Sequence, residues 1–557
     1  WRTAATWTGT TPFMTLSRFL TAAAAAILLA GCVGIDSGLG SSMLPVSNTY
    51  RIVNPAPIAI PVSQKMADSL SGFSSSRITV GAIRKDDEYG LTTRSSVLTL
   101  VPIFTADHDM GENRIFQSMR FQAALDSVSV EDLSETGIIQ QLNVYELTRP
   151  LDFVKDFDCN GTIPHGSTRI TKGVPVLNGA DSMSFWFTEE FGKKYLEADR
   201  YFDDFAAYKK AFPGFMLETS EPLGQGGRIN IFNLQLQVDT DYSLLTGNYA
   251  QLNYSAEYDG ERRDTSAFFY YGATGFYDLD SLIDNSTTLT FPQYALNLTG
   301  HGTAAQAGVA GAEIMVEGGG GLKPVISAQT IRNAVISAIE AAGDDPSKAI
   351  INKASLNFNY VHDYDPLYEK TYKLPQVLSP TCRLHTSDTT VSFMGLTDSS
   401  SSEENQGERN KSKFSFNPDI TYHVQELLGM KDDNSKLLDG SYDIWLLIMH
   451  NDTETTTTSG NSDISDYYQY LAYQSYMSNM YGGYGGYGYS SYGYGSSYSN
   501  YYNYAMLAQM YGQSTTSTST TTRLDSDRYY YCRLYGPSAS EESLRPTLTF
   551  TYSVPKE

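Results

Sequence analysis

Tyrosine is concentrated in one segment of the sequence, residues 481–504, which reads YGGYGGYGYSSYGYGSSYSNYYNY. A tyrosine ring is rigid and amphipathic, so it can stack on a sugar or on another protein, and the intervening glycines let the surface adapt. The same composition is typical of low-complexity segments that self-associate, and of loops with no selected partner. All three interpretations stay open. The candidate binding residues are Tyr481, Tyr484, Tyr487, Tyr489, Tyr492 and Tyr494.

Clustered carboxylates raise the question of a metal site. Residues 107–113 read DHDMGEN, and calcium prefers several oxygen ligands from one loop. The glycine comes one position too early for an EF-hand, and the closing glutamate is missing. The pattern favours a solvated turn, and the pairs Asp156/Asp158 and Asp363/Asp365 are interpreted in the same way. No metal or other cofactor is predicted.

Catalytic motifs are not apparent in the sequence. Neither Gly-x-Ser-x-Gly nor His-Glu-x-x-His occurs, and 62 acidic residues make accidental carboxylate pairs abundant. The run GGGGLK at 318–323 lacks the Lys-Ser/Thr pair and the βαβ setting of a phosphate loop, which favours a flexible connector. His423 is interpreted as a packing or surface residue. We therefore predict that the chain is not an enzyme.

The stretch MTLSRFLTAAAAAILLAGC, residues 14–32, has the features of a signal peptide in the right order. Arg18 precedes an apolar run, residues 19–30, which is too short to span a bilayer. The run ends in Leu-Ala-Gly-Cys, which resembles the lipobox of bacterial lipoproteins. That resemblance implies removal of residues 14–31 and acylation of Cys32, for example with palmitate. Two or three acyl chains hold a protein stably at a membrane without a transmembrane helix.

Net charge and cysteine content bear on nucleic-acid binding, zinc binding and disulfide formation. The net charge is -23, and such a chain is repelled by a phosphate backbone, so nucleic acid is not expected as a partner. Beyond Cys32 the chain contains Cys159, Cys382 and Cys532. Cys-x-x-Cys and Cys/His zinc spacings do not occur, and the pairing of these three cysteines stays open.

Short runs of alternating apolar and polar residues, such as RITVGAI and QQLNVYELT, recur along the chain between turn residues. This period of two indicates strands with one buried face. The predicted fold is therefore mainly β, with tandem β-sandwich or jelly-roll-like domains and a few inserted helices. Helices are predicted at 188–212, at 326–342 and at 417–430, the last capped by Asn417, and a buried strand is predicted at 441–451.

The predicted organisation follows from these elements. It comprises a translated flank (1–13), the signal peptide (14–31), a flexible tether (32–48), an N-terminal domain (49–300), a C-terminal domain (301–557) and a low-complexity loop within the latter (452–526).

The order of motifs resembles the Bacteroidota lipoproteins of the domain-of-unknown-function family numbered 4270. The resemblance covers nearly the whole chain after the signal peptide and rests on the order of LGSSMLP, ITVGAIRKDDEYGLTTRSS, LDSVSVE, NVYELTRPLD, ITKGVPVLNGADSMSF, FDDFAAYKKAFPGFMLET, GGRINIF, AIINKASLNF and CRLYGPSASEESLRPTLTFTY. It implies an outer-membrane lipoprotein, and it implies no known activity and no functional residues. The tyrosine-rich segment departs from the family pattern.

The phrase INKASLNF also resembles strands of jelly-roll modules, with Ile351, Ala354, Leu356 and Phe358 expected to point inward. The sequence thus predicts a non-enzymatic binding or assembly component of the cell envelope or cell surface. The alternative is a glycan-binding lipoprotein of a polysaccharide uptake system. The expected partners are the membrane, through the lipid anchor, and either an envelope protein or a glycan. Which face of the outer membrane carries the protein stays open.

Overall fold

The structure is a computed structural model, and it describes residues 50–85, 89–104, 108–130, 137–154, 157–179, 182–239, 245–272, 275–277, 288–362, 374–385, 391–398, 406–457 and 516–556. These residues form a mainly β protein with a few helices, which confirms the predicted fold class. The sheets are antiparallel throughout the pairings of this part of the chain. No helix within the described ranges is long and apolar enough to cross a membrane.

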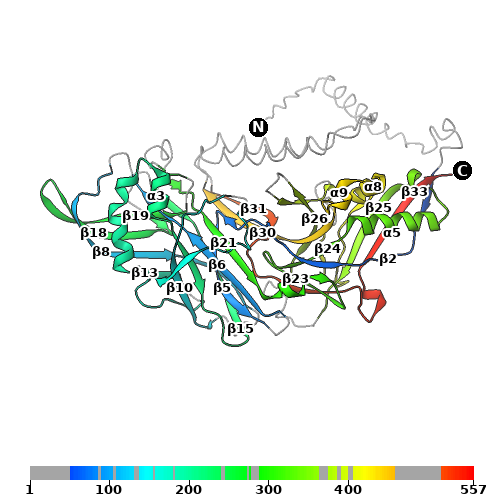
Figure 1. The fold of residues 1–557 in the computed structure, drawn as a ribbon, viewed down its shortest axis with the longest axis horizontal. Coiled ribbons are helices and arrows are strands. Elements are labelled where there is room, and N and C mark those ends of the chain that lie inside the picture. The colour runs from blue at the N-terminus through cyan, green and yellow to red at the C-terminus, as the bar shows by residue number, and fades with distance from the viewer. Residues whose placement is uncertain are drawn as a thin grey trace, which may run out of the picture.

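Two halves lie side by side along the long axis of the molecule (Figure 1). The N-terminal half contains one large sheet. Its strands are β4 (Phe73–Ser74), β5 (Arg77–Arg84), β6 (Leu91–Leu98), β9 (Leu125–Val130), β10 (Gln140–Leu147), β11 (His165–Arg169), β12 (Val176–Leu177), β14 (Phe215–Thr219), β15 (Gly226–Asn233) and β21 (Ala295–His301).

A second sheet of this half packs against the first. Its strands are β7 (Leu100–Ile103), β8 (Glu112–Ala123), β13 (Met183–Trp186), β18 (Ala250–Tyr258) and β19 (Glu261–Tyr271). Both sheets contribute to one aromatic-rich core, in which Phe121 of β8 meets Phe215 of β14 edge to face at 5.8 Å. A small sheet of β16 (Leu236–Asp239), β17 (Leu245–Gly247) and β20 (Thr288–Thr290) adjoins them.

The C-terminal half is also a two-sheet structure with a shared core. One sheet contains β1 (Tyr50–Val53), β2 (Ile58–Ala59), β25 (Ile350–Asn359), β28 (Arg409–Asn410), β29 (Ser415–Phe416) and β33 (Thr547–Pro555). The other contains β3 (Ser63–Met66), β22 (Gly308–Val309), β24 (Leu322–Ile326), β26 (Val377–His385), β27 (Val391–Gly395), β30 (Ile444–Thr457) and β31 (Thr516–Leu524). Strands β23 (Glu313–Glu317) and β32 (Tyr531–Tyr535) pair separately.

Helices cover the C-terminal half: α5 (Ala328–Ala341), α8 (Thr421–Gly429) and α9 (Ser435–Leu438), with the 3-10 turns η4 (Gly302–Gln306), η5 (Pro346–Lys348) and η6 (Glu542–Leu544). Helix α5 lies where the sequence predicts it, and Ile331, Val335 and Ile339 are buried because their spacing of four places them on one face. The four residues predicted to point inward from the INKASLNF strand are buried in this core as well.

Sheet membership differs from the predicted domain boundaries. Strands β1 and β2 pair with β33, and β3 pairs with β24, so residues 50–66 belong to the C-terminal half although they begin the predicted N-terminal domain. Alternation of apolar residues identifies a strand but not its partner, because any strand with one apolar face satisfies the same pattern.

The predicted helix 188–212 is divided into three pieces, α2 (Glu189–Lys194), η3 (Tyr195–Tyr201) and α3 (Phe205–Ala211). Thr188 caps the first piece as expected, because its hydroxyl accepts from the N–H of Phe191 at 3.3 Å. Asp204 caps α3 by accepting from the N–H of Ala207 at 3.0 Å, which marks a new helix start.

Helix α8 begins later than predicted, at Thr421, and Asn417 is not its cap. The Asn417 amide instead donates to Asn357 Oδ1 at 2.6 Å. Two carboxylates cap the helix. Asp419 accepts from the N–H of Thr421, and Asp398 accepts from the N–H groups of Tyr422 and His423. The prediction considered only residues next to the helix, whereas Asp398 comes from a distant segment.

Strands β30 and β31 form an antiparallel ribbon between the two halves (Figure 1). Their register runs from Met449 opposite Leu524 to Thr457 opposite Thr516. The predicted loop 452–526 is therefore shorter at both ends, because residues 452–457 and 516–524 are strand. Threonine favours strands through its branched Cβ, although its polarity made these residues resemble a loop.

Candidate functional site

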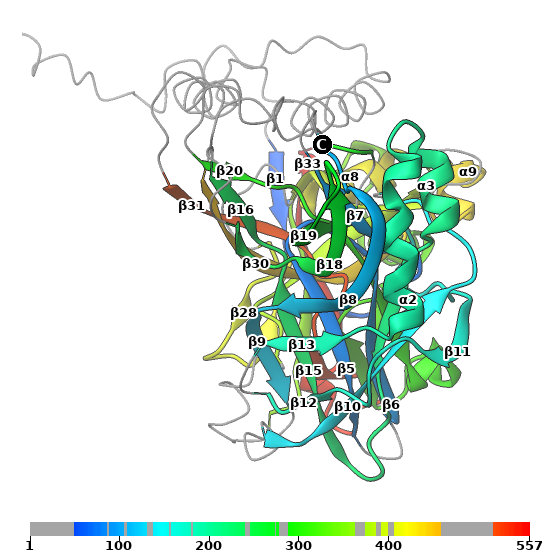
Figure 2. The ribbon, with the colours of Figure 1, turned by 90° about the vertical axis from the view of Figure 1, so that its left-hand side faces the viewer.

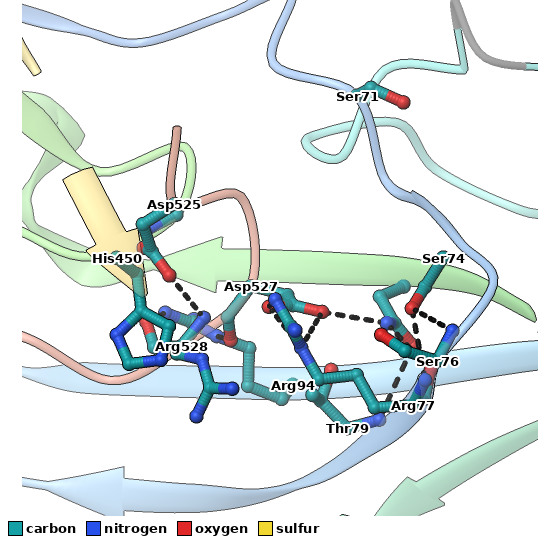
Figure 3. Close-up of polar contacts among 12 residues, drawn as sticks. Ser71, Ser74, Ser76, Arg77, Thr79, Arg94, His450, Asp525, Asp527 and Arg528 are labelled. Atoms are coloured by element: carbon teal, nitrogen blue, oxygen red, sulfur yellow. Dashed lines mark hydrogen bonds and ion pairs between the residues drawn. The ribbon is translucent and has the colours of Figure 1, made fainter. Parts of the chain in front are cut away.

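The residues proposed from the sequence, Cys32 and the six tyrosines between Tyr481 and Tyr494, lie outside the described residues. What the structure does describe is the base of the ribbon that leads to the tyrosine-rich segment. Directly after β31 the chain enters a buried polar cluster between the two halves (Figure 3). We call this the junction cluster, and it consists of Arg77, Arg94, Asn297, Asp525 and Asp527.

Asp527 binds strands of the N-terminal half. Arg77 of β5 donates to its carboxylate through Nη2 at 2.8 Å and through Nε at 3.0 Å and 3.1 Å. The amide of Asn297, on β21, donates to Asp527 Oδ2 at 2.7 Å. Burial opposes ionisation of Asp527, but Arg77, Arg528 and Asn297 outweigh it and lower the pKa of this carboxyl. The Asp527 carboxylate is thus held as the buried anion of this ion pair, whose arginine is half-buried.

Arg94 of β6 is buried, with 1% of its surface exposed, and bonds to carbonyls rather than to a carboxylate. Its guanidinium donates to the backbone oxygens of Asp527, Arg528 at 2.8 Å and Thr93 at 2.9 Å. Burial lowers the pKa of Arg94, while Asp525 and Asp527 oppose the shift. This side chain thus fixes the backbone of the segment that returns from the ribbon.

Asp525 and Asp527 have opposite pKa shifts. Burial and the neighbouring carboxylate of Asp527 raise the pKa of Asp525, although it accepts from the N–H of Gly319 at 2.6 Å and of Arg528 at 3.0 Å. Two carboxyls whose pKa values are pushed apart are a common arrangement in catalysis. Here, however, both are buried and hydrogen-bonded to the protein, so the pair holds the chain rather than a substrate.

The glycine run 318–321 is a buried turn next to this cluster, and not the flexible connector predicted from the sequence. A Cβ at Gly318 would lie 2.2 Å from the carbonyl oxygen of Arg528, and one at Gly320 would lie 1.8 Å from Asn160 Oδ1. Gly319 has a φ of 57°. Glycine is therefore required by close packing and by the left-handed backbone.

Lys323 holds the turn from inside. Its Nζ donates to the carbonyl oxygens of Glu317, Gly319 at 2.9 Å and Gly321 at 3.1 Å. Burial lowers the pKa of Lys323 to about 8, against the opposing effect of Asp525. With all three protons directed at carbonyls, this lysine is a structural cation and not a nucleophile.

Glu317 and His301 complete the polar surroundings of the turn. Burial opposes ionisation of Glu317, but His301, Thr303 and the N–H of Leu322 outweigh it and lower the carboxyl pKa to about 2. The Nδ1 of His301 lies 3.5 Å from Glu317 Oε1. Burial lowers the pKa of His301, and the Glu317 carboxylate opposes this shift.

Asp107 and Asp156 lie outside the described residues, as do Asp363 and Asp365. The described part of the first cluster is a turn: Asp109 accepts from the N–H of Gly111 at 2.8 Å, and His108 packs beside Phe202. No group of three or more His, Cys, Asp or Glu side chains in the described ranges is arranged to hold a metal ion.

His423 is a packing residue. Its ring stacks on Tyr442 at 5.6 Å, and its Nε2 lies 3.1 Å from the Tyr442 carbonyl oxygen. Burial lowers its pKa to about 4. A pocket of about 500 Å³ opens nearby, at the start of α8, but its Asp398 carboxylate is already bonded to the helix.

The three cysteines left open by the sequence are free thiols in the structure, and each is buried. Burial raises the pKa of Cys159 and of Cys532 to about 12, and it raises the pKa of Cys382 further. They form no disulfide with one another.

Sequence reasoning did not identify the junction cluster. One signal was available: Arg77 and Arg94 lie in strands made mostly of apolar or small residues, and Asp525 and Asp527 come shortly before the buried strand β32. Charges in such positions are seldom tolerated unless they are paired. The sequence does not show which aspartate pairs with which arginine.

The described residues thus define a mainly β scaffold whose two halves are joined by the Arg77–Asp527 ion pair and the hydrogen bonds of the junction cluster. Comparison of the chain with protein-family models, with curated proteins and with solved structures finds no match. The resemblance to the lipoprotein family numbered 4270 therefore stays a prediction based on the order of its motifs.

Proposed function

We propose that this chain is a lipid-anchored protein of the outer membrane that acts as a non-enzymatic binding or assembly component. The anchor is Cys32, and the proposal follows the signal peptide and the lipobox resemblance. The working segment is the tyrosine-rich one, and its partner is an envelope protein that packs against the tyrosine rings.

One observation carries this proposal: the segment leaves from and returns to a ribbon whose base is fixed to both halves. The strand that returns, β31, ends one residue before Asp525, and two residues later Asp527 is bound by Arg77. A binding segment costs less ordering entropy when its two ends are held in place. The polar groups of the junction cluster bond to other atoms of the protein, which supports a role in holding the base of the ribbon rather than in binding a ligand.

The test is a pull-down from crosslinked native envelopes with the wild type and with a variant in which residues 458–515 are replaced by an Asn-Gly turn. This turn suits a two-residue hairpin, so the ribbon of β30 and β31 is kept. A stoichiometric partner that is captured by the wild type and lost from the variant is the expected result. Capture of the same partner by both proteins would assign binding to the scaffold and overturn the proposal.

A further inference from the structure

The outer face of the five-stranded sheet lies at the end of the molecule away from the C-terminal half (Figures 1 and 2). Strand register aligns four side chains in one row across this face. Trp186 of β13 is opposite Arg120 of β8, which is opposite Gln251 of β18, which is opposite Phe268 of β19. We call this row, together with Asn253, the tryptophan face.

Aromatic rings stand at both ends of the row. Trp186 is 44% exposed, which is high for the largest apolar side chain. Phe268 is half-buried and meets Tyr249 edge to face at 5.5 Å. Three strand spacings separate Trp186 from Phe268, or roughly 14 Å. The face therefore offers two separate rings to an extended ligand.

Arg120 supplies a positive charge between the rings. Its Cζ lies 5.9 Å from the Trp186 ring centroid, and its Nε donates to Ser184 Oγ at 2.8 Å. Within the described part of the chain it has no carboxylate partner, whereas Arg84, Arg262 and Arg263 of the same half each pair with a glutamate. In a chain of net charge -23 this exposed cation is complementary to an anionic ligand.

The amides beside Arg120 are held in fixed orientations. Gln251 Nε2 donates to Asn253 Oδ1 at 2.9 Å and to Ser266 Oγ at 3.2 Å, and Asn253 Nδ2 donates to Ser118 Oγ at 3.0 Å. These bonds use the donor side of Gln251 and leave its carbonyl oxygen available as an acceptor among the described residues. A ligand hydroxyl can donate to this oxygen without any rearrangement.

We propose that the tryptophan face binds an acidic oligosaccharide. One sugar ring stacks on Trp186, its carboxylate accepts from the terminal nitrogens of Arg120, a hydroxyl donates to Gln251, and a further ring reaches Phe268. A protein partner would favour an apolar centre, whereas this row places Arg120 and Gln251 between its rings. The site is independent of the tyrosine-rich segment and goes beyond the function proposed above.

Calorimetric titration of the purified protein tests this site. The ligands are tetrasaccharides of galacturonic, mannuronic and guluronic acid, and the methyl ester of each, which removes the charge and keeps the sugar. At least one acid form should bind, and its ester should bind about tenfold more weakly, since a lost charge-assisted bond costs at least that much. Binding by none of the acids, or equal binding of acid and ester, would overturn the proposal.

Three variants locate the site. Trp186→Ala should weaken binding about tenfold or more, and Arg120→Gln should abolish the preference for acid over ester. Tyr422→Ala, which removes an exposed aromatic ring from the other half, should bind as the wild type does. Unchanged affinity in Trp186→Ala, with an unchanged melting temperature, would refute the assignment.

Replacement of residues 458–515 should leave binding of the acidic tetrasaccharide intact. Loss of binding in that variant would refute the independence of the tryptophan face from the tyrosine-rich segment.

Discussion

Arg77 and Asp527 lie 450 positions apart in the chain and form an ion pair that uses both carboxylate oxygens, at 2.8 to 3.1 Å. Only 12% of the arginine side chain and 1% of the aspartate side chain are exposed. The pair joins β5 of the N-terminal half to the segment that follows the ribbon of the C-terminal half. Both the cohesion of the halves and the position of the ribbon therefore depend on it.

Asp527→Ala should destabilise the protein strongly, because it removes the carboxylate to which Arg77 and Asn297 both donate inside the largely buried junction cluster. Removal of one partner from a buried pair costs about 3–5 kcal/mol. Urea unfolding of the purified protein measures the loss. Glu221→Ala is the matched control, since the Arg84–Glu221 pair is exposed and worth about 1 kcal/mol or less. Equal losses in both variants would contradict a structural role for the junction cluster.

Gly318→Ala should also destabilise the junction. The added methyl group would lie 2.2 Å from the Arg528 carbonyl oxygen and 2.7 Å from the Tyr530 nitrogen, and backbone atoms cannot turn aside as a side chain can. Such overpacking costs about 1–3 kcal/mol. Thermal unfolding should show a lowered midpoint. Gly311→Ala has nothing within 4 Å of its added Cβ and should leave the midpoint unchanged. A tolerated alanine at position 318 would show that the turn is not tightly packed.

Stability should fall as the pH falls from 6.5 toward 4, in part because of His423. Burial lowers the folded pKa of this ring to about 4, below its ordinary 6.5, so the unfolded chain takes up the proton first. The contribution is complete above pH 6.5 and declines by about 3 kcal/mol over this window. Urea midpoints at several pH values should change less steeply in His423→Gln. Identical slopes would assign the pH dependence to other groups.

The thiols should be unreactive in the folded protein. Cys159, Cys382 and Cys532 are buried and free, and their raised pKa values leave almost no thiolate at pH 8. In a Cys32→Ser variant, a chromogenic disulfide reagent should label three thiols after denaturation and none rapidly before it. A reductant should not shift the unfolding midpoint. Fewer than three thiols after denaturation without a reductant would reveal a disulfide that the structure lacks.

The sequence predicted local structure well where the signal comes from residues close together in the chain. The inward positions Ala354, Leu356 and Phe358 alternate strictly, and each is buried. Thr188 begins a helix because a hydroxyl before a polar first turn is a local signal. Both features depend on near neighbours in the chain, which a sequence displays directly.

Features that depend on distant partners were missed. The cap of α8 comes from Asp398, and the acceptor of Arg77 comes from Asp527, so neither can be read from adjacent residues. The glycine run at 318–321 predicts a flexible connector when the sequence is considered alone, because glycine permits both mobility and close packing. Only the surrounding Asn160 and Arg528 decide between the two. The tryptophan face likewise arises from register across four strands.

The pairing of β1 with β33 has a consequence for the order in which the chain acquires its structure. Synthesis begins at the N-terminus, so Tyr50 is made long before its partner Pro555. All strands of the N-terminal half's large sheet lie between residues 73 and 301 and can assemble while the rest of the chain is still being synthesised. Strands β1 and β2 must wait for residues 547–555, with their edges unpaired. Completion of the C-terminal half is thus the last step of folding, and a chaperone that shields strand edges would act there.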